Sequence, residues 1–255
     1  MIDTQPPLAP SGGALDLVYR DQWLCAVNKP CGLMVHRSNR GTDKRFAMQL
    51  LRDQLGQRVF PIHRLDRATS GLLLFALDAA SAAHLGEQMM ARSVTKRYLA
   101  VVRGYLDDEG LIDHPLAPDG KGPEKDARTR YRSLARLELP FAVGRYPTSR
   151  YSLAVAEPET GRMHQIRRHF KHLFHPIVGD TTYGEGRHNR LFRQHFGCHR
   201  LLLHAWQLDV DHPEDGRRLQ LQAPPGEEFE RVLERFGEVD GEPPLTGGGP
   251  GVSGR

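Results

Sequence analysis

The chain has 255 residues and a mass of 28.7 kDa, enough for one large domain or two small ones and for a core that needs no disulfides or metals. Its three cysteines are odd in number and form no CxxC pair, which argues against a secreted disulfide scaffold and favours the cytoplasm. The longest apolar run, Leu72–Leu77, is far too short to span a bilayer, and we expect no membrane segment and no secretory leader.

The charge is unevenly distributed along the chain. Residues 1–206 hold 30 Lys and Arg against 20 Asp and Glu, a net charge of +10, whereas residues 207–242 hold 4 against 11, a net charge of −7. A basic body is typical of proteins that bind a polyanion, because Lys and Arg displace counterions from phosphates. A basic surface that is merely solvated explains the same composition, so charge alone leaves both interpretations open.

The chain-order pattern predicts an α+β fold between two tails. Residues 1–14 and 241–255 are rich in Gly and Pro and are expected to be disordered tails. The predicted strands are Leu15–Arg20, Leu24–Asn28, Gly71–Asp78, Arg97–Gly104, Ala127–Leu137, Tyr151–Glu157, Leu201–Val210 and Arg218–Gln222. The predicted helices are Lys44–Leu55 behind Thr42 and Asp43, Ala79–Arg92 behind Asp78, Met163–Leu173 and Glu227–Phe236. Long strands with few crossovers favour a mixed, largely antiparallel central sheet with flanking helices and loops, in one domain over residues 15–240.

A polar loop that leads into a buried strand is the strongest candidate for chemistry. Residues 63–71 lead directly into an apolar strand, and such a loop can hold a reactive group rigidly. Asp66 lies between Arg64 and Arg67, and neighbouring cations favour the ionised carboxylate that a nucleophile or base requires. An aspartate that caps a turn or makes a structural ion pair explains the same pattern.

Four blocks of the sequence, in order, resemble the RluA-type pseudouridine synthases. The most specific block, His63–Gly71, matches the family motif HRLDxxTSG. The other blocks are Val27–Pro30 with Gly32–His36, Lys96–Ala100, and Gly161–His169. Within the family, the chain is most similar to the branch that modifies the uridine at position 65 in the T-stem of tRNA, through Gly144–Tyr151, His175–Asp180 and Leu203–Ala205. The resemblance covers about Leu15 to Phe236, with no room before Leu15 for the S4 module of larger members.

The resemblance implies the pseudouridine synthase fold, with a catalytic cleft across its sheet, and assigns roles to residues. Asp66 is implied as the catalytic carboxylate, Tyr98 as the residue at the proton-handling position, and Arg167 as the cation that orients Asp66. The implied substrate-binding residues are Arg64, His63, Ile166 and Lys29. Without the block around it, Tyr98 would be better explained as a core aromatic on a half-buried strand. Attack of Asp66 at C1′, attack at C6 and a glycal route all stay open.

Isomerisation of uridine needs no cofactor, and the sequence contains no Walker loop and no GxGxxG motif before a helix. The stretch Gly161–Gly179 carries four histidines, but it has no acid or cysteine to complete a metal site. We therefore expect no metal, and we interpret this stretch as a helix that faces phosphates, with histidines that pack or donate hydrogen bonds.

The expected partner is tRNA, whose target uridine must be flipped out of its stem. Arg64 is the candidate to fill the vacated space. No protein partner is indicated, and we expect a monomer. The alternatives are a pseudouridine synthase for ribosomal RNA or another tRNA uridine, a non-catalytic RNA-binding protein in which Asp66 only caps a turn, and a metal-dependent hydrolase that uses the histidines.

Overall fold

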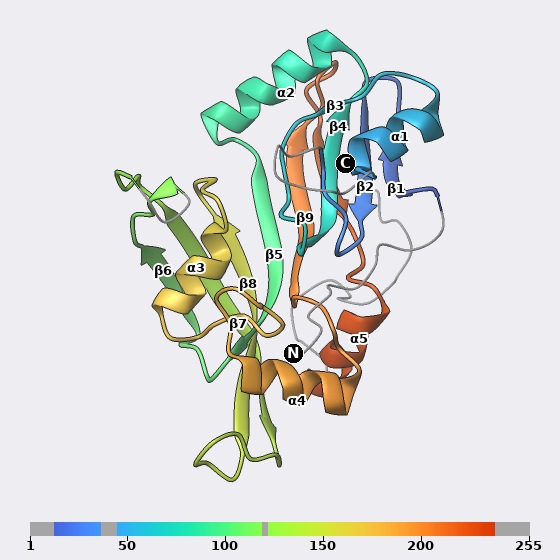
Figure 1. Ribbon diagram of the computed structural model, residues 1–255. Helices are drawn as coiled ribbons and strands as arrows, with labels where there is room; N and C mark the ends of the chain where they lie inside the picture. Colours follow the sequence, from blue (N-terminus) through green and yellow to red (C-terminus); the bar gives the residue numbers. More distant parts are fainter. Residues whose placement is uncertain (1–12, 37–44, 119–121, 238–255) are drawn as a thin grey trace. The chain divides into compact units, whose positions relative to one another are not determined.

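The structure, a computed structural model, describes residues 13–36, 45–118 and 122–237 (Figure 1). The expected tails therefore lie outside the described residues, apart from Gly13 and Ala14. The described chain divides into two compact units. The first contains residues 13–36, 45–96 and 205–224, and the second contains residues 97–118, 122–204 and 225–237.

The first unit is built on a sheet with strand order β1 (Asp16–Arg20), β2 (Leu24–Lys29), β4 (Ser70–Ala76) and β9 (Leu203–Asp211, in this unit from Ala205). β3 (Phe60–Pro61) pairs with β4 and β10 (Arg218–Gln222) pairs with β9, both antiparallel, as are β1 with β2 and β2 with β4. Every residue of β4 is buried, which explains its continuous apolar sequence.

Gly71 in β4 allows the strands of the first unit to approach each other closely. Its backbone has φ 110°, and a Cβ at this position would lie 2.2 Å from the carbonyl oxygen of Ala205. Any other residue would therefore push β9 away from β4.

Helix α2 (Ala79–Ala91) packs against β3 and β4 of the first unit. Its predicted N-cap is confirmed, because Asp78 Oδ1 accepts the Ser81 N–H at 2.8 Å and Asp78 Oδ2 accepts the Ser81 hydroxyl at 2.6 Å. Gln88 then fixes the helix to β9, since its side chain donates to the Asp211 carbonyl at 2.8 Å and accepts the Asp211 N–H at 3.0 Å.

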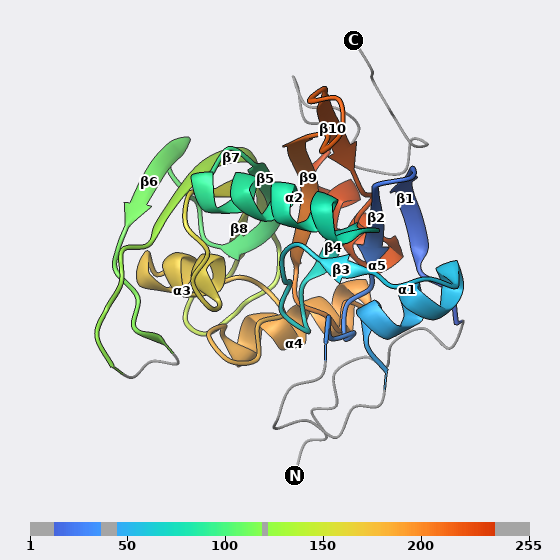
Figure 2. The ribbon, with the colours of Figure 1, turned by 90° about the horizontal axis from the view of Figure 1, so that it is seen from above.

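The second unit has strand order β5 (Thr95–Arg103, in this unit from Arg97), β8 (Ser149–Pro158), β7 (Arg128–Leu139) and β6 (Glu109–Asp113), and all three pairings are antiparallel. Helix α3 (Gln165–His172) packs against β7 and β8 (Figure 2). Helix α4 (Gly186–Phe196) contacts α5 (Glu227–Leu233), which continues into the 3₁₀ turn η2 (Glu234–Phe236). The predicted α+β class with a largely antiparallel sheet is confirmed.

Helix α1 (Ala47–Leu55) and helix α3 begin later than predicted. α1 starts at Ala47 instead of Lys44, after Phe46 and without a side-chain cap; the expected caps Thr42 and Asp43 lie outside the described residues. α3 starts at Gln165 instead of Met163, because His164 has a left-handed backbone with φ 54°.

Three elements were not predicted, namely α4, β3 and β6. Helix α4 has a strongly polar sequence, buries only Asn189, Leu191 and Phe192, and begins without a side-chain cap. β3 has two residues, and β6 lies at the edge of its sheet with one buried residue, Ile112. Such short or half-exposed segments carry little hydrophobic periodicity.

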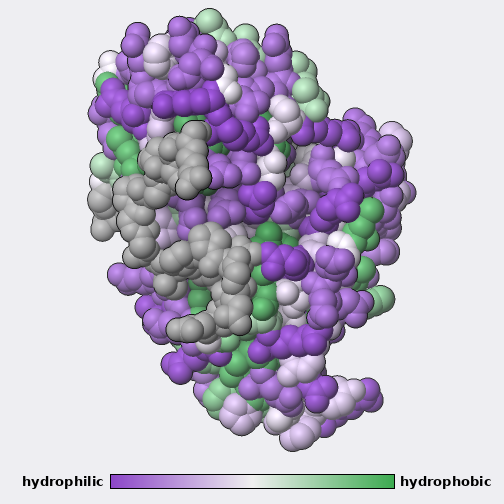
Figure 3. Space-filling view, turned by 180° about the vertical axis from the view of Figure 1, so that it is seen from behind, coloured by the Kyte–Doolittle hydropathy of each residue, from purple (hydrophilic) through white to green (hydrophobic). Residues whose placement is uncertain are grey.

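On the face shown in Figure 3 the described residues are mainly hydrophilic, and hydrophobic residues form separate patches. Within the described ranges, no helix is both long and apolar enough to cross a membrane.

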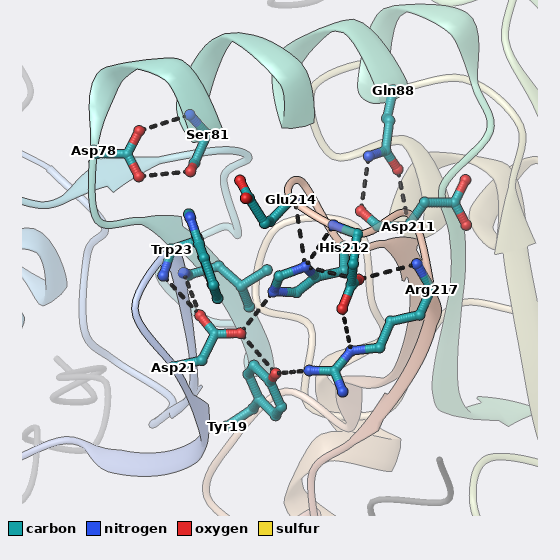
Figure 4. A network of polar contacts seen from close by, with 12 residues as sticks. Tyr19, Asp21, Trp23, Asp78, Ser81, Gln88, Asp211, His212, Glu214 and Arg217 are labelled. Atoms are coloured by element: carbon teal, nitrogen blue, oxygen red, sulfur yellow. Dashed lines mark hydrogen bonds and ion pairs between the residues drawn. The ribbon is translucent and has the colours of Figure 1, made fainter. Parts of the chain in front are cut away.

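A polar network joins the β1–β2 turn to the β9–β10 turn within the first unit (Figure 4). Asp21 accepts the Trp23 N–H at 2.8 Å and the Tyr19 hydroxyl at 2.7 Å, and its Oδ2 lies 2.8 Å from Nε2 of His212. The His212 side chain is 1% exposed. Arg217 donates to the Tyr19 oxygen at 3.0 Å. The network therefore fixes two distant turns of the chain through the buried His212, the half-buried Tyr19 and Asp21, and the exposed Arg217.

Candidate active site

Asp66 lies in the loop between β3 and β4 of the first unit. Its side chain is half-buried, its carbonyl accepts the Thr69 N–H at 3.1 Å, and Leu65 before it is buried. The loop then enters β4, whose residues are all buried. A short loop that is anchored by a buried residue and a core strand holds its carboxylate on a rigid support.

Lys29 at the end of β2 fixes the C-terminal side of this loop. Its side chain is fully buried, and its ammonium donates to the carbonyls of Pro30 at 2.9 Å, Leu33 at 2.8 Å and Arg67 at 3.4 Å. Arg67 also accepts the Gly32 N–H at 2.8 Å and donates through Nε to the Gly32 carbonyl at 3.0 Å. The residue after Asp66 is therefore held against the loop that follows β2.

His63 fixes the N-terminal side of the same loop. The Leu74 N–H of β4 donates to His63 Nε2 at 3.2 Å, which requires that nitrogen to be unprotonated. Burial, followed by the charge of Lys96, lowers the pKa of His63 to about 4. The imidazole is therefore neutral at pH 7. Two residues that are held in place therefore lie on either side of Asp66: His63, three residues before it, and Arg67, one residue after it.

Tyr98 lies on β5 of the second unit, where its Cα pairs with that of Ala156 in β8. Its side chain is half-buried. The neighbouring Arg97 pairs with Glu157 at 2.9 Å across the same two strands. The strand position of Tyr98 is as predicted, and it holds the phenol on the sheet and not on a loop.

Helix α3 is fixed to β7 by two buried polar side chains. Gln165 donates to the Arg128 carbonyl at 2.8 Å and to the Thr129 hydroxyl at 3.0 Å. His169 Nδ1 lies 2.9 Å from the Thr129 hydroxyl, and its Nε2 lies 3.0 Å from the His114 carbonyl. Burial lowers the pKa of His169 to about 4, so this ring is neutral at pH 7.

Arg167 on α3 makes a buried, bidentate ion pair with Asp180. Arg167 Nε lies 2.7 Å from Oδ2 of Asp180 and Nη2 lies 2.9 Å from Oδ1, with both side chains less than one tenth exposed. The Tyr183 ring lies 5.1 Å from the guanidinium carbon. Burial opposes the charge of Asp180, but Arg167 and the N–H groups of Thr182 and Tyr183 outweigh it and keep the pKa of Asp180 below its usual value. The guanidinium is thereby fixed in one plane.

The loop that carries Asp180 is shaped around that carboxylate. Asn189 on α4 accepts the Gly179 N–H at 2.8 Å and donates to the Asp180 carbonyl at 2.9 Å. Gly179 has φ 79°, and a Cβ there would lie 1.9 Å from the Arg200 carbonyl oxygen. Asp180 belongs to a block that resembles the family, yet no role was predicted for it; its contact with Arg167 is visible only in the folded chain.

The structure places the predicted site residues in two groups. The first unit carries Lys29, His63, Arg64 and Asp66, and the second carries Tyr98, Ile166 and Arg167. Arg64 is exposed and Ile166 is buried next to Arg167. The pairing of Arg167 with Asp66 stays a prediction. In the part of the chain that the structure describes, no group of three or more His, Cys, Asp or Glu could hold a metal ion.

Comparisons with known proteins agree with the fold. The family model described as RNA pseudouridylate synthase matches residues 24–172. A tRNA pseudouridine synthase C from Haemophilus ducreyi is 48% identical over 235 residues, which are 88% of this chain and 96% of that protein. A tRNA pseudouridine synthase C from Pasteurella multocida is 52% identical over 211 residues, 78% of this chain and 86% of that protein.

A solved structure leads to the same class of enzyme. Human RNA Pseudouridylate Synthase Domain Containing 1 superposes with a TM-score of 0.68 at 28% identity, covering 85% of this chain and 86% of that one. The family model, the relatives and this solved structure together define the class as an RNA-modifying isomerase. The chain belongs to the RNA pseudouridylate synthase family, and the expected RluA-type membership is confirmed. It is a pseudouridine synthase.

Proposed function

We propose that the protein converts a uridine of tRNA to pseudouridine, with Asp66 as the catalytic carboxylate. The observation that carries the proposal is the loop that His63 and Arg67 anchor on either side of Asp66. The names of relatives about half identical over most of the chain supply tRNA as the substrate class. The proposed target is the uridine at position 65 in the T-stem, and the enzyme is proposed to work as a monomer in the cytoplasm.

The proposed reaction is an isomerisation that consumes no second substrate. The bond between N1 and C1′ breaks, the uracil turns, and a bond between C5 and C1′ forms; C5 loses a proton and N1 gains one, so atoms and electrons balance. Asp66 supplies the anion at the reacting nucleotide, Arg167 orients that carboxylate, and Tyr98 handles the proton at C5. Carboxylates and cations that are fixed before the substrate arrives lower the barrier, because they need no reorganisation during the reaction.

The substrate uridine must leave its stem before it reaches Asp66. Flipping costs a few kcal/mol of stacking and pairing. Arg64 lies two residues before Asp66 and is exposed, so its planar guanidinium is the group that we assign to the space the base vacates. Lys29 contributes through the backbone carbonyls that it binds, which keep the Asp66 loop in place.

Mapping of pseudouridine in RNA transcripts tests the substrate. Purified protein is incubated with unmodified tRNA, and pseudouridine is located by carbodiimide labelling and primer extension. We expect a single stop at position 65 and none in a transcript with cytidine at that position. A stop at another tRNA uridine would contradict the assigned position, and conversion of ribosomal RNA fragments without conversion of tRNA would contradict the substrate. Tight tRNA binding without any product would favour a non-catalytic RNA-binding protein.

A further inference from the structure

Phe174, just after helix α3, combines two unfavourable features. Its side chain is 81% exposed, and its backbone has φ 61°, in the left-handed region that strains a bulky residue. Its N–H donates to the Lys171 carbonyl at 2.9 Å, and the His175 N–H donates to the Phe170 carbonyl at 2.9 Å. Glycine is the usual residue at such a helix end. Glycine would remove both the strain and the exposed ring, so the folded chain by itself gives no reason for phenylalanine.

Phe174 lies beside the start of helix α4. Its carbonyl accepts a hydrogen bond from Arg103 Nη2 at 3.1 Å, and the same guanidinium pairs with Glu185, the residue before α4. Lys171, at the end of α3, is exposed, and its carbonyl accepts the Phe174 N–H. The exposed ring therefore lies next to a helix end that carries a cation, and further exposed arginines follow on α4.

The segment around Phe174 is strongly basic. Residues 161–200 contain eight Lys and Arg and two acids, Asp180 and Glu185. Each acid pairs with an arginine of the same unit. The remaining positive charge suits a polyanion, and nucleic acid is the polyanion that also offers flat apolar surfaces for a ring to stack on.

We propose that Phe174 is a contact for the RNA substrate, stacking on an unpaired base while the flanking cations bind phosphates. The inference rests on the proposed function only in taking RNA as the partner. Single-stranded RNA is commonly held by aromatic rings that stack on bases. The backbone that presents the ring is fixed by the helix end and by Arg103, so little freedom is lost when the base arrives.

Replacement of Phe174 by glycine separates a binding role from a structural one. We expect Phe174→Gly to raise Tm, because the strain is relieved, and to weaken tRNA binding by about 5- to 100-fold. Phe174→Trp keeps a ring and should bind within about twofold of the wild type. The slope of log K against log salt should stay unchanged in Phe174→Gly and become shallower by about one in Lys171→Gln, because only the lysine contacts phosphate.

Arg92→Gly is the matched control for strain, since Arg92 ends helix α2 with φ 59°. Its rise in Tm calibrates the rise expected for Phe174→Gly. Unchanged tRNA affinity in Phe174→Gly would overturn the inference, and so would weaker binding accompanied by a lower Tm. Wild-type protein that binds tRNA but isomerises no uridine would contradict the proposed function alone, because the binding comparison does not depend on turnover.

Discussion

The buried residue Asp180 fixes the position of the Arg167 guanidinium. Its carboxylate accepts hydrogen bonds from Nε and Nη2 of Arg167, and the Tyr183 ring covers the guanidinium. Removing two charges from water is costly, and a bidentate geometry with further N–H donors offsets that cost. In the proposed reaction Asp180 is a positioning residue, because it acts through Arg167.

If Arg167 orients Asp66 as proposed, Asp180→Asn should lower kcat by about 10- to 100-fold with little change in KM, because the guanidinium is then misplaced while RNA binding persists. Asp180→Ala should also lower the free energy of unfolding by about 3 to 5 kcal/mol, since the buried Arg167 loses the carboxylate that accepts two of its N–H groups. Steady-state conversion of tRNA and urea unfolding measure the two effects. Tyr183→Phe, which keeps the ring over the guanidinium, is the matched control. Wild-type kcat in Asp180→Asn would contradict the positioning role.

At the scale of elements, the sequence predicts those helices and strands whose signal lies in neighbouring residues. The apolar run of β4 and the Asp78 cap of α2 are both visible in the sequence, and both are present in the fold. Helix α4 could not be predicted, because its buried Asn189 is polar and serves the distant Gly179–Asp180 backbone. The same limit applies to the candidate site. A motif marks Asp66, whereas the burial of Lys29 beneath three carbonyls follows only from tertiary contacts.

Asp78→Ala should lower the free energy of unfolding by about 0.5 to 2 kcal/mol, because the Ser81 N–H at the start of α2 loses its acceptor. Asp78→Ser, which restores a capping oxygen, should recover most of the loss. Urea denaturation followed by far-UV circular dichroism measures both variants. Equal stability of Asp78→Ala and the wild type would show that the cap contributes nothing to the fold.

At the scale of the whole molecule, the half-buried His63 and the buried His169 couple folding to pH. His63 and His169 each have a pKa lowered from 6.5 to about 4, by burial above all. Because the folded pKa lies below the unfolded one, the unfolded chain binds more protons between these values. Their contribution to stability is complete above pH 6.5 and is lost as pH falls towards about 4.

The free energy of unfolding should therefore fall between pH 6.5 and about 4, with these two groups contributing up to about 2.7 kcal/mol per pH unit. Urea titrations at half-unit intervals of pH measure the slope. In His63→Gln one titrating group is lost, so the slope of the free energy of unfolding against pH should decrease by roughly 1.4 kcal/mol per pH unit. A stability that does not change over this range would show that neither histidine is kept neutral by the fold.

The most direct measurement is single-turnover conversion of tRNA by the Asp66→Asn variant. This substitution replaces one carboxylate oxygen by an amide nitrogen and retains the size of the side chain. We predict tRNA affinity within a few-fold of the wild type and no detectable pseudouridine. Asp53→Asn, at an exposed position on α1 where Asp53 pairs with Arg52 at 2.7 Å, should convert tRNA at the wild-type rate. Conversion by Asp66→Asn at a rate comparable to the wild type would contradict the catalytic role of Asp66.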